Sequence, residues 1–207
     1  SIAPTRIAIL ASGSGSNAEA ILRHFEGSET VDVAFVGCNR PETQAGIYER
    51  TRQMGVETTR FNKAELLDGG LLQALHSKGI DWVVLAGFLM HIPESLVRAY
   101  RGRMLNVHPS LLPKFGGKGM YGLHVHRAVL DANEKESGMT VHKVTEAYDE
   151  GAVVFQAACA VEPNDTPESL AERVMELEHM YYPRAIAACI AEHVTSCLLY
   201  TSPSPRD

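Results

Sequence analysis

Asn106 and His108 stand two positions apart at the end of an apolar run, in the sequence LNVHPS. In a β-strand this spacing places both side chains on one face, and open α/β sheets bind their ligands at the carboxyl ends of parallel strands. An amide donor and a titratable imidazole on one face can therefore serve one reaction centre. A structural hydrogen-bonded pair is the alternative, and the glycine-rich segment nearby favours catalysis.

A second candidate is the segment SGSGSN at residues 12–17, between a predicted strand and a predicted helix. Small residues let the backbone approach an anion, and the first amides of a helix carry partial positive charge. The segment predicts a phosphate site, with a plain strand-to-helix turn as the alternative.

The same segment fits the dinucleotide pattern GxGxxA through Gly13, Gly15 and Ala18. An NAD enzyme would also need an acid near the end of the second strand to hold the ribose. Residues 38–40 read Cys-Asn-Arg instead, which disfavours NAD, although the arginine would tolerate the phosphate of NADP.

Asp149 is a third candidate, in the turn between the last two predicted strands. Aspartate is common in turns because its side chain bonds to the nearby backbone, so this position alone does not indicate a catalytic role. For His124, His126 and His142, which occur near these motifs, we expect core or surface roles. No set of side chains has the spacing of metal ligands, so we predict no metal site.

Alternating strand and helix patterns must position these residues. Ala18, Ile21, Leu22 and Phe25 have the spacing of one helix face, between apolar runs at 6–11 and 31–37. The pattern continues with a weak strand at 56–61, a helix at 66–76, a buried central strand at 81–87, a short helix at 93–99 and a strand at 104–107. It predicts an α/β fold with a mostly parallel central sheet and helices on both faces.

The second half begins with an irregular segment, because residues 114–122 hold four glycines in nine positions. We predict strands at 139–145 and 153–161. Thr166 followed by Pro167 has the residue types of a helix start, so a long closing helix is expected there.

No linker divides two cores, so residues 1–196 are predicted to form a single domain. The sequence CLLYTSPSPRD at 197–207 breaks from the preceding pattern. It resembles the translation of a sequencing-library adaptor, and we expect it to be a non-native tail that replaces the natural C-terminus. A disordered polar tail is the alternative.

The composition restricts the class of protein. Of 207 residues, 45% are hydrophobic and 21% charged, which is typical of a globular domain and not of a disordered chain. The apolar run at 82–90 is about half of what a membrane helix needs, so no membrane association is expected. A net charge of -6 argues against a broad nucleic-acid surface. Four cysteines without a CxxC pair, and no leader-like start, favour the cytoplasm.

Taken in order, six motifs make residues 6 to about 193 similar to phosphoribosylglycinamide formyltransferases: SGSGSN, VVLAGF, LNVHPSLLPKF, GLHVHRAV, TVHKVTEAYDEG and ELEHMYYP. The resemblance implies a Rossmann-like formyltransferase fold. It implies transfer of a formyl group from 10-formyltetrahydrofolate to glycinamide ribonucleotide, in purine synthesis. The implied partners are these small molecules, with no metal, and the chain is expected to be a monomer or homodimer.

The resemblance also implies roles for single residues. The catalytic triad falls on Asn106, His108 and Asp149. Substrate-binding positions fall on Gly15, Ser16 and Asn17 for the phosphate and on Glu178 for the ribose hydroxyls. The folate-binding positions fall on the turn at 146–149 and on Leu89, Met90, His91, Ile92 and Asn106, with Lys63 as a possible cation because Met90 stands where many members have arginine.

The residue types suit this chemistry. An amine that attacks a formyl carbon builds negative charge on oxygen, which the Asn106 amide and a protonated His108 can stabilise. We expect Asp149 to raise the pKa of His108 and keep it protonated near neutrality, and to orient a water that carries the amine proton away. The segment 116–121 is longer than the usual connection in the family, so we expect a lid that moves differently.

Other functions remain as alternatives. Methionyl-tRNA formyltransferase and formyltetrahydrofolate hydrolase share the Asn-x-His and Asp core, but each needs a further domain that we do not expect in 207 residues. An NADP-dependent oxidoreductase or a catalytically silent nucleotide-binding module would use the GxGxxA turn. Either would leave the NVHPS and DEG motifs unexplained.

Overall fold

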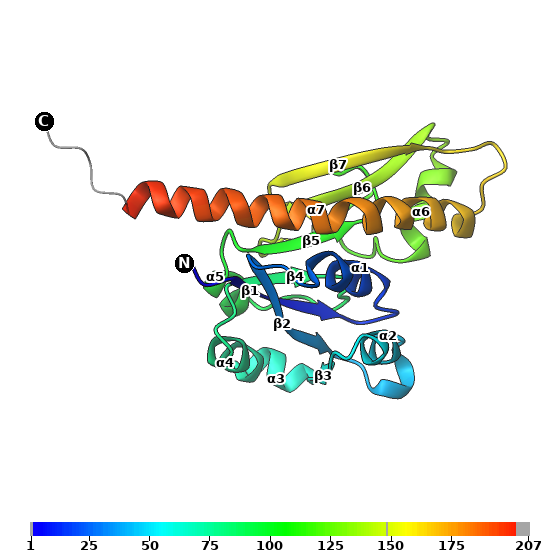
Figure 1. Ribbon diagram of the computed structural model, residues 1–207. Helices are drawn as coiled ribbons and strands as arrows, with labels where there is room; N and C mark the ends of the chain where they lie inside the picture. The colour runs from blue at the N-terminus through cyan, green and yellow to red at the C-terminus, as the bar shows by residue number, and fades with distance from the viewer. Residues whose placement is uncertain (1, 148, 202–207) are drawn as a thin grey trace, which may run out of the picture.

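A seven-stranded sheet forms the centre of the computed structural model, which describes residues 2–147 and 149–201 (Figure 1). The strand order is β3-β2-β1-β4-β5-β6-β7. The strands are β1 (Thr5–Ala11), β2 (Val31–Cys38), β3 (Thr59–Arg60), β4 (Trp82–Leu85), β5 (Met104–His108), β6 (Glu136–Lys143) and β7 (Val153–Ala160).

The sheet is mostly parallel, as predicted. All pairings from β3 across to β5 are parallel, and β6 and β7 add antiparallel pairs at one side. The predicted central strand is β4, which is buried throughout and has three strands on either side. The chain leaves β1 toward β2 and later returns to β4 on the other side of β1, which creates a switch point where such sheets bind ligands.

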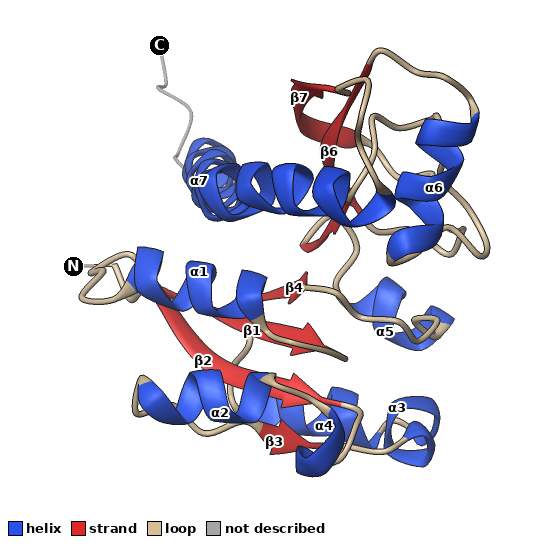
Figure 2. Ribbon diagram, turned by 90° about the vertical axis from the view of Figure 1, so that its right-hand side faces the viewer, coloured by secondary structure: helices blue, strands red, loops and turns tan. Residues whose placement is uncertain are grey.

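Helices cover both faces of the sheet (Figure 2). The α-helices are α1 (Ser16–Phe25), α2 (Ile47–Gln53), α3 (Lys63–Asp68), α4 (Gly70–Ser77), α5 (Glu94–Ala99), α6 (Leu123–Asp131) and α7 (Pro167–Thr201), and a short 3-10 turn, η1, spans Glu42–Gln44. Residues of α1, α2, α6 and α7 join one apolar cluster with the sheet, and residues of α3, α4 and α5 join a second cluster on the other face.

Two predicted helix features are confirmed. The four apolar residues chosen for the first helix, Ala18, Ile21, Leu22 and Phe25, are its buried residues. The hydroxyl of Thr166 accepts a hydrogen bond from the Ser169 amide, so it caps α7. This long helix lies along the sheet beside α1 (Figure 1) and brings its residues to the carboxyl ends of the strands.

Other predicted elements were wrong in extent. The single helix at 66–76 is two helices, because Gly69 adopts a left-handed conformation (φ 92°) that ends α3 before α4 begins. The strand at 56–61 pairs only through Thr59–Arg60. The strand at 139–145 is instead β6, which begins three residues earlier and ends at Lys143. The helices α2 and α6 were not predicted.

The predicted non-native tail at 197–207 stays a prediction. Helix α7 includes its first five residues and ends at Thr201. The rest of the predicted tail, residues 202–207, lies outside the described residues.

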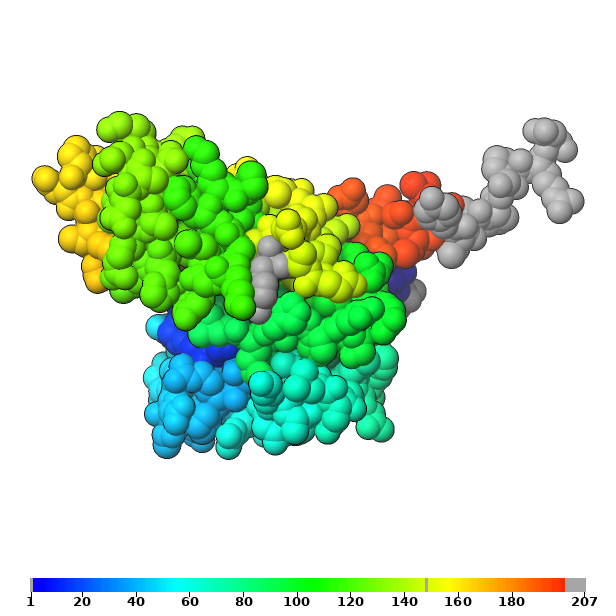
Figure 3. Space-filling view, turned by 180° about the vertical axis from the view of Figure 1, so that it is seen from behind, coloured from blue at the N-terminus to red at the C-terminus, as the bar shows by residue number. Residues whose placement is uncertain are grey.

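In the space-filling view, the green and yellow segments of the second half lie above the blue and cyan segments of the first half (Figure 3).

The hydroxyl of Tyr182 ties α7 to the sheet, because it donates a hydrogen bond of 2.7 Å to the carbonyl of Leu85 at the end of β4. Tyr182 is fully buried. The substitution Tyr182→Phe leaves this buried carbonyl without the hydroxyl, and we expect it to lower the free energy of unfolding by about 1 to 2 kcal/mol. Urea unfolding measures the loss.

Tyr181→Phe is the matched control, since the neighbouring Tyr181 ring packs on Phe155 and its hydroxyl makes no hydrogen bond within the described part of the chain. It should unfold like the parent protein. Equal losses in both variants would contradict the assigned role of the Tyr182 hydroxyl.

Candidate active site

A cavity of about 750 Å³ opens at the carboxyl ends of β1, β4 and β5. Five segments form most of its walls: 13–17, 85–92, 106–109, 117–123 and 144–147. Asp149 and individual residues of α6, β6 and α7 complete them: His126, His142, Ala171, Met175 and Glu178. This volume is in the range of ligand-binding clefts. The cavity brings together the three motifs that the sequence singled out: the Ser-Gly segment, the Asn-x-His pair and the turn that holds Asp149.

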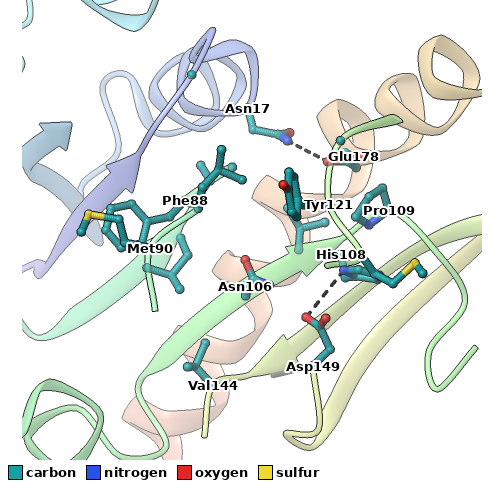
Figure 4. A pocket seen from close by; sticks show the side chains of 18 of the residues that line it. Asn17, Phe88, Met90, Asn106, His108, Pro109, Tyr121, Val144, Asp149 and Glu178 are labelled. Atoms are coloured by element: carbon teal, nitrogen blue, oxygen red, sulfur yellow. Dashed lines mark hydrogen bonds and ion pairs between the residues drawn. The ribbon is translucent and has the colours of Figure 1, made fainter. Parts of the chain in front are cut away.

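His108 and Asp149 meet in this cavity (Figure 4). The His108 Nδ1 atom lies 3.6 Å from Asp149 Oδ1, and both side chains are largely buried, with 5% and 12% of their surface exposed. The other ring nitrogen, Nε2, lies 2.8 Å from the carbonyl oxygen of Phe115. Since that carbonyl can only accept, the neutral ring carries its hydrogen on Nε2 and presents Nδ1 to the carboxylate.

The expected rise in the pKa of His108 was wrong in its net direction. Burial is the largest effect, and it lowers the pKa below the usual value because a charged ring is costly to remove from water. Asp149 and the Phe115 carbonyl raise the pKa, as expected for an acid and an acceptor, but they do not overcome burial. His108 is therefore mostly neutral near pH 7 and able to accept a proton.

The Asp149 carboxylate is held by contacts on several sides. Its Oδ2 atom accepts a hydrogen bond of 2.9 Å from the Gly117 amide, and its Oδ1 atom lies 3.6 Å from His142 Nε2. Burial by itself raises the pKa of Asp149, but the histidines and the Gly117 amide outweigh it, so the net pKa is lowered. The residue has a left-handed backbone (φ 55°), which aspartate tolerates better than most residues.

Asn106 is oriented by a histidine on the neighbouring strand. Its Nδ2 atom lies 3.1 Å from His142 Nε2, and the β5–β6 register places these two residues opposite each other. The Nδ1 atom of His142 faces the Lys143 carbonyl at 3.2 Å. A neutral ring then donates from Nδ1 and accepts the Asn106 N–H at Nε2, which leaves the second amide N–H of Asn106 for a ligand.

The Ser-Gly segment forms the start of α1, as predicted. Gly15 precedes the helix in a left-handed conformation (φ 76°), and a Cβ at this position would lie 2.6 Å from the Ile47 side chain. Only glycine fits this position without strain. Residues 13–17 all line the cavity, so the amino end of α1 presents backbone amides and partial positive charge to it.

Asn17 and Glu178 join α1 to α7 at the same end of the cavity (Figure 4). The Asn17 amide donates a hydrogen bond of 2.8 Å to Glu178 Oε1. Burial raises the pKa of Glu178 to about 7, against the opposing effect of that hydrogen bond. The Oδ1 atom of Asn17 is buried and lacks a hydrogen-bond partner within the described part of the chain, so it is suited to accept from a ligand.

Comparisons with known proteins identify the family. Residues 5–186 match the formyl transferase family. The chain belongs to the formyl transferase family.

The chain is 41% identical over 194 residues to the chloroplastic phosphoribosylglycinamide formyltransferase of Arabidopsis thaliana, and the match covers 91% of this chain and 66% of that protein. It is 36% identical to the Escherichia coli phosphoribosylglycinamide formyltransferase, covering 87% and 85%. The chain thus spans slightly less than two thirds of the plant relative.

A solved phosphoribosylglycinamide formyltransferase from Anaplasma phagocytophilum superimposes with a TM-score of 0.82 at 33% identity, covering 91% of this chain and 88% of that structure. The likeness therefore extends from sequence to the arrangement of the sheet and helices, and the predicted fold is confirmed.

The family's expected folate positions divide into two groups. Leu89, Met90, His91 and Ile92 line the cavity, and so do the described residues 146, 147 and 149 of the expected turn, whose residue 148 lies outside the described residues. Lys63 does not line it, because it is the exposed first residue of α3.

A buried serine fixes the first of these segments. Ser12 Oγ donates a hydrogen bond of 2.6 Å to Asn39 Oδ1 and accepts one of 2.9 Å from the Leu89 amide. Asn39 occupies the position where a dinucleotide enzyme would carry its ribose-binding acid, and it is used here to hold Ser12. This contact disfavours the oxidoreductase alternative.

Two histidines have site positions that the sequence analysis missed. His142 lies between Asn106 and Asp149, and its place opposite Asn106 could have been found from the alternation along the two predicted strands. His126 also lines the cavity, where burial and the nearby His108 lower its pKa to about 4. His124 is exposed beside the Tyr121 ring, in agreement with a surface role.

Two further findings concern ligands and membranes. Within residues 2–147 and 149–201, no three His, Cys, Asp or Glu side chains are grouped as a metal site. In the same described part, no helix has both the length and the apolar character of a membrane span.

The substitution Asp149→Asn tests the electrostatics of the site. It removes the negative charge that raises the pKa of His108, while burial remains, so the pKa of His108 should fall further below its usual value. Nuclear magnetic resonance titration of the imidazole protons, assigned with a His108 variant, gives the midpoint. The exposed neighbour Glu150→Gln should leave it unchanged. A midpoint that rises in Asp149→Asn would contradict the assigned contact.

Proposed function

We propose that this chain transfers the formyl group of 10-formyltetrahydrofolate to the amino group of N1-(5-phosphoribosyl)glycinamide, a step of purine biosynthesis. The main support is the meeting of Asn106, His108 and Asp149 in a cavity that is also lined by the amino end of helix α1. The relatives named above carry the same activity in their names.

The two substrates occupy different ends of the cavity in this proposal. The ribonucleotide phosphate binds the amides of residues 13–17, and its ribose hydroxyls bind Asn17 and Glu178. The folate lies along Leu89–Ile92 and the turn that begins at Val144. This arrangement places the amine and the formyl carbon beside Asn106 and His108, between the two ends.

The reaction begins when the amine nitrogen attacks the formyl carbon and the C=O electron pair moves to oxygen. The free N–H of Asn106 and the Nε2–H of His108 donate to this oxygen, which replaces the Phe115 carbonyl as the acceptor of His108. Preorganised donors in a buried site stabilise such an oxyanion far better than water does.

Proton transfer completes the exchange. The proton lost by the amine reaches His108 Nδ1 on the side of Asp149, whose negative charge stabilises the imidazolium. The imidazolium then gives its Nε2 proton to the N10 nitrogen of the folate as the bond from N10 to the formyl carbon breaks and the oxyanion returns its electron pair to the C=O bond. The hydrogen left on Nδ1 is lost to water and Nε2 takes one up, which restores the starting ring. The lowered pKa of His108 suits this order, because the resting ring is a base.

We further propose that the protein works in the cytoplasm. None of its four cysteines, all within the described residues, forms a disulfide, which fits a reducing compartment.

The first test is a spectrophotometric assay with glycinamide ribonucleotide and a 10-formylfolate donor. The parent protein should formylate the amine, and His108→Ala should lower kcat by about 100-fold or more because it loses both a donor and a proton carrier. His24→Ala, on the exposed face of α1, is the control and should keep full activity. Near-normal turnover by a folded His108→Ala protein would overturn the assignment.

Glu178 gives a second test through pH. Its carboxyl group accepts ribose hydroxyls more strongly when ionised, and burial raises its pKa to about 7, so the KM for the ribonucleotide should rise about tenfold as pH falls from 8 to 6. The phosphate of the substrate also titrates near pH 6.

Glu178→Gln separates these effects, because the substrate titrates equally in both assays. The variant should show a high KM at both pH values and only the dependence that the substrate contributes. A parent KM with the same pH dependence as the variant would refute the role of Glu178.

A further inference from the structure

The phosphate end of the cavity lacks a cation from the helix that faces it. Helix α7 contributes Met175 and Glu178 to this wall, and the hydroxyl of Ser16 lies 3.7 Å from the sulfur of Met175. A thioether is a weak partner for a phosphate, and a carboxylate repels one. The neutral donors of residues 13–17, their backbone amides and serine hydroxyls, therefore remain, and a phosphate dianion needs further charge compensation.

Lys118 is the one lysine or arginine among the described residues that line the cavity. It belongs to the longer-than-usual segment after the HPSLLPKF motif, with Gly117 and Gly119 on either side. Its side chain is exposed at the cavity, and it makes no ion pair with any residue that the structure describes. The ammonium group is thus available to an anion.

The position of this segment indicates which substrate Lys118 serves. Its Gly117 amide is bonded to the Asp149 carboxylate, and the Tyr121 ring lies in the space between the Asn17–Glu178 pair and Asn106 (Figure 4). The segment between them, which contains Lys118, therefore runs along the cavity from Asp149 toward the Asn17–Glu178 pair. Of the labelled residues proposed for the folate, Val144 lies beyond Asn106 from the Asn17–Glu178 pair, and Met90 lies at the left of the same view.

We propose that Lys118 determines specificity for a phosphorylated acceptor by binding the phosphate over the amino end of α1. The inference rests on the proposed function, because it assumes that the acceptor is a ribonucleotide. A charged donor opposite a helix start adds both attraction and selectivity, since an unphosphorylated acceptor gains nothing from it.

Steady-state kinetics of Lys118→Gln test the proposal. The KM for glycinamide ribonucleotide should rise about tenfold, while the KM for the folate donor and the value of kcat change less than twofold. Lys118→Arg should restore most of the affinity. Binding of ribose 5-phosphate, measured by calorimetry, should weaken by a similar factor, and binding of ribose should not change.

Lys114→Gln is the matched control from the same loop, because Lys114 is exposed, does not line the cavity and pairs with Glu134 at 3.2 Å. It should behave like the parent protein. An unchanged ribonucleotide KM in Lys118→Gln, or a rise confined to the folate KM, would overturn the role of Lys118. If the parent protein formylates no ribonucleotide at all, the proposed function fails first, so the two failures are distinguishable.

Discussion

The buried carboxylate of Asp149 is the contact on which the site depends. It lies 3.6 Å from the nearest nitrogen of each of two histidines and accepts the Gly117 amide, so groups from β5, β6 and the glycine-rich segment meet at one charge. In a site of low polarity, such a charge acts strongly on its neighbours. It also needs its partners, because an unpaired buried carboxylate is costly. The candidate catalytic residues and the glycine-rich segment are therefore linked as one unit.

Local patterns predicted much of the fold. The spacing of Ala18, Ile21, Leu22 and Phe25 identified α1, and the continuous apolar run around Val83 identified the central strand, because burial imposes these periods directly. The break at Gly69 was missed because an apolar helix period continues on both sides of it. Helix α6 was missed because it begins directly after a glycine-rich segment. Its first residues are exposed, so the apolar spacing of Val125 and Val129 is too short to indicate a helix.

Only part of the site could be predicted from the sequence. The side of the strand shared by Asn106 and His108 follows from the period of two, and their presence in one cavity agrees with it. The importance of Asp149 came from a resemblance and not from its turn position. The direction of the shift in the pKa of His108 could not be predicted, because it depends on how completely the surrounding chain removes water from the ring. Lys63 was expected as a cation because Met90 stands where many members have arginine, but as the exposed first residue of α3 it does not line the cavity.

The Phe115 carbonyl has a consequence for inhibitors. It already satisfies His108 Nε2, and it belongs to a residue with an unusual backbone conformation (φ 57°). A compound that reaches this nitrogen competes with an internal acceptor instead of with loosely held solvent, so an added polar group there gains little affinity unless it accepts a better hydrogen bond. Selective drug design would do better to extend along the apolar wall and leave this internal contact in place.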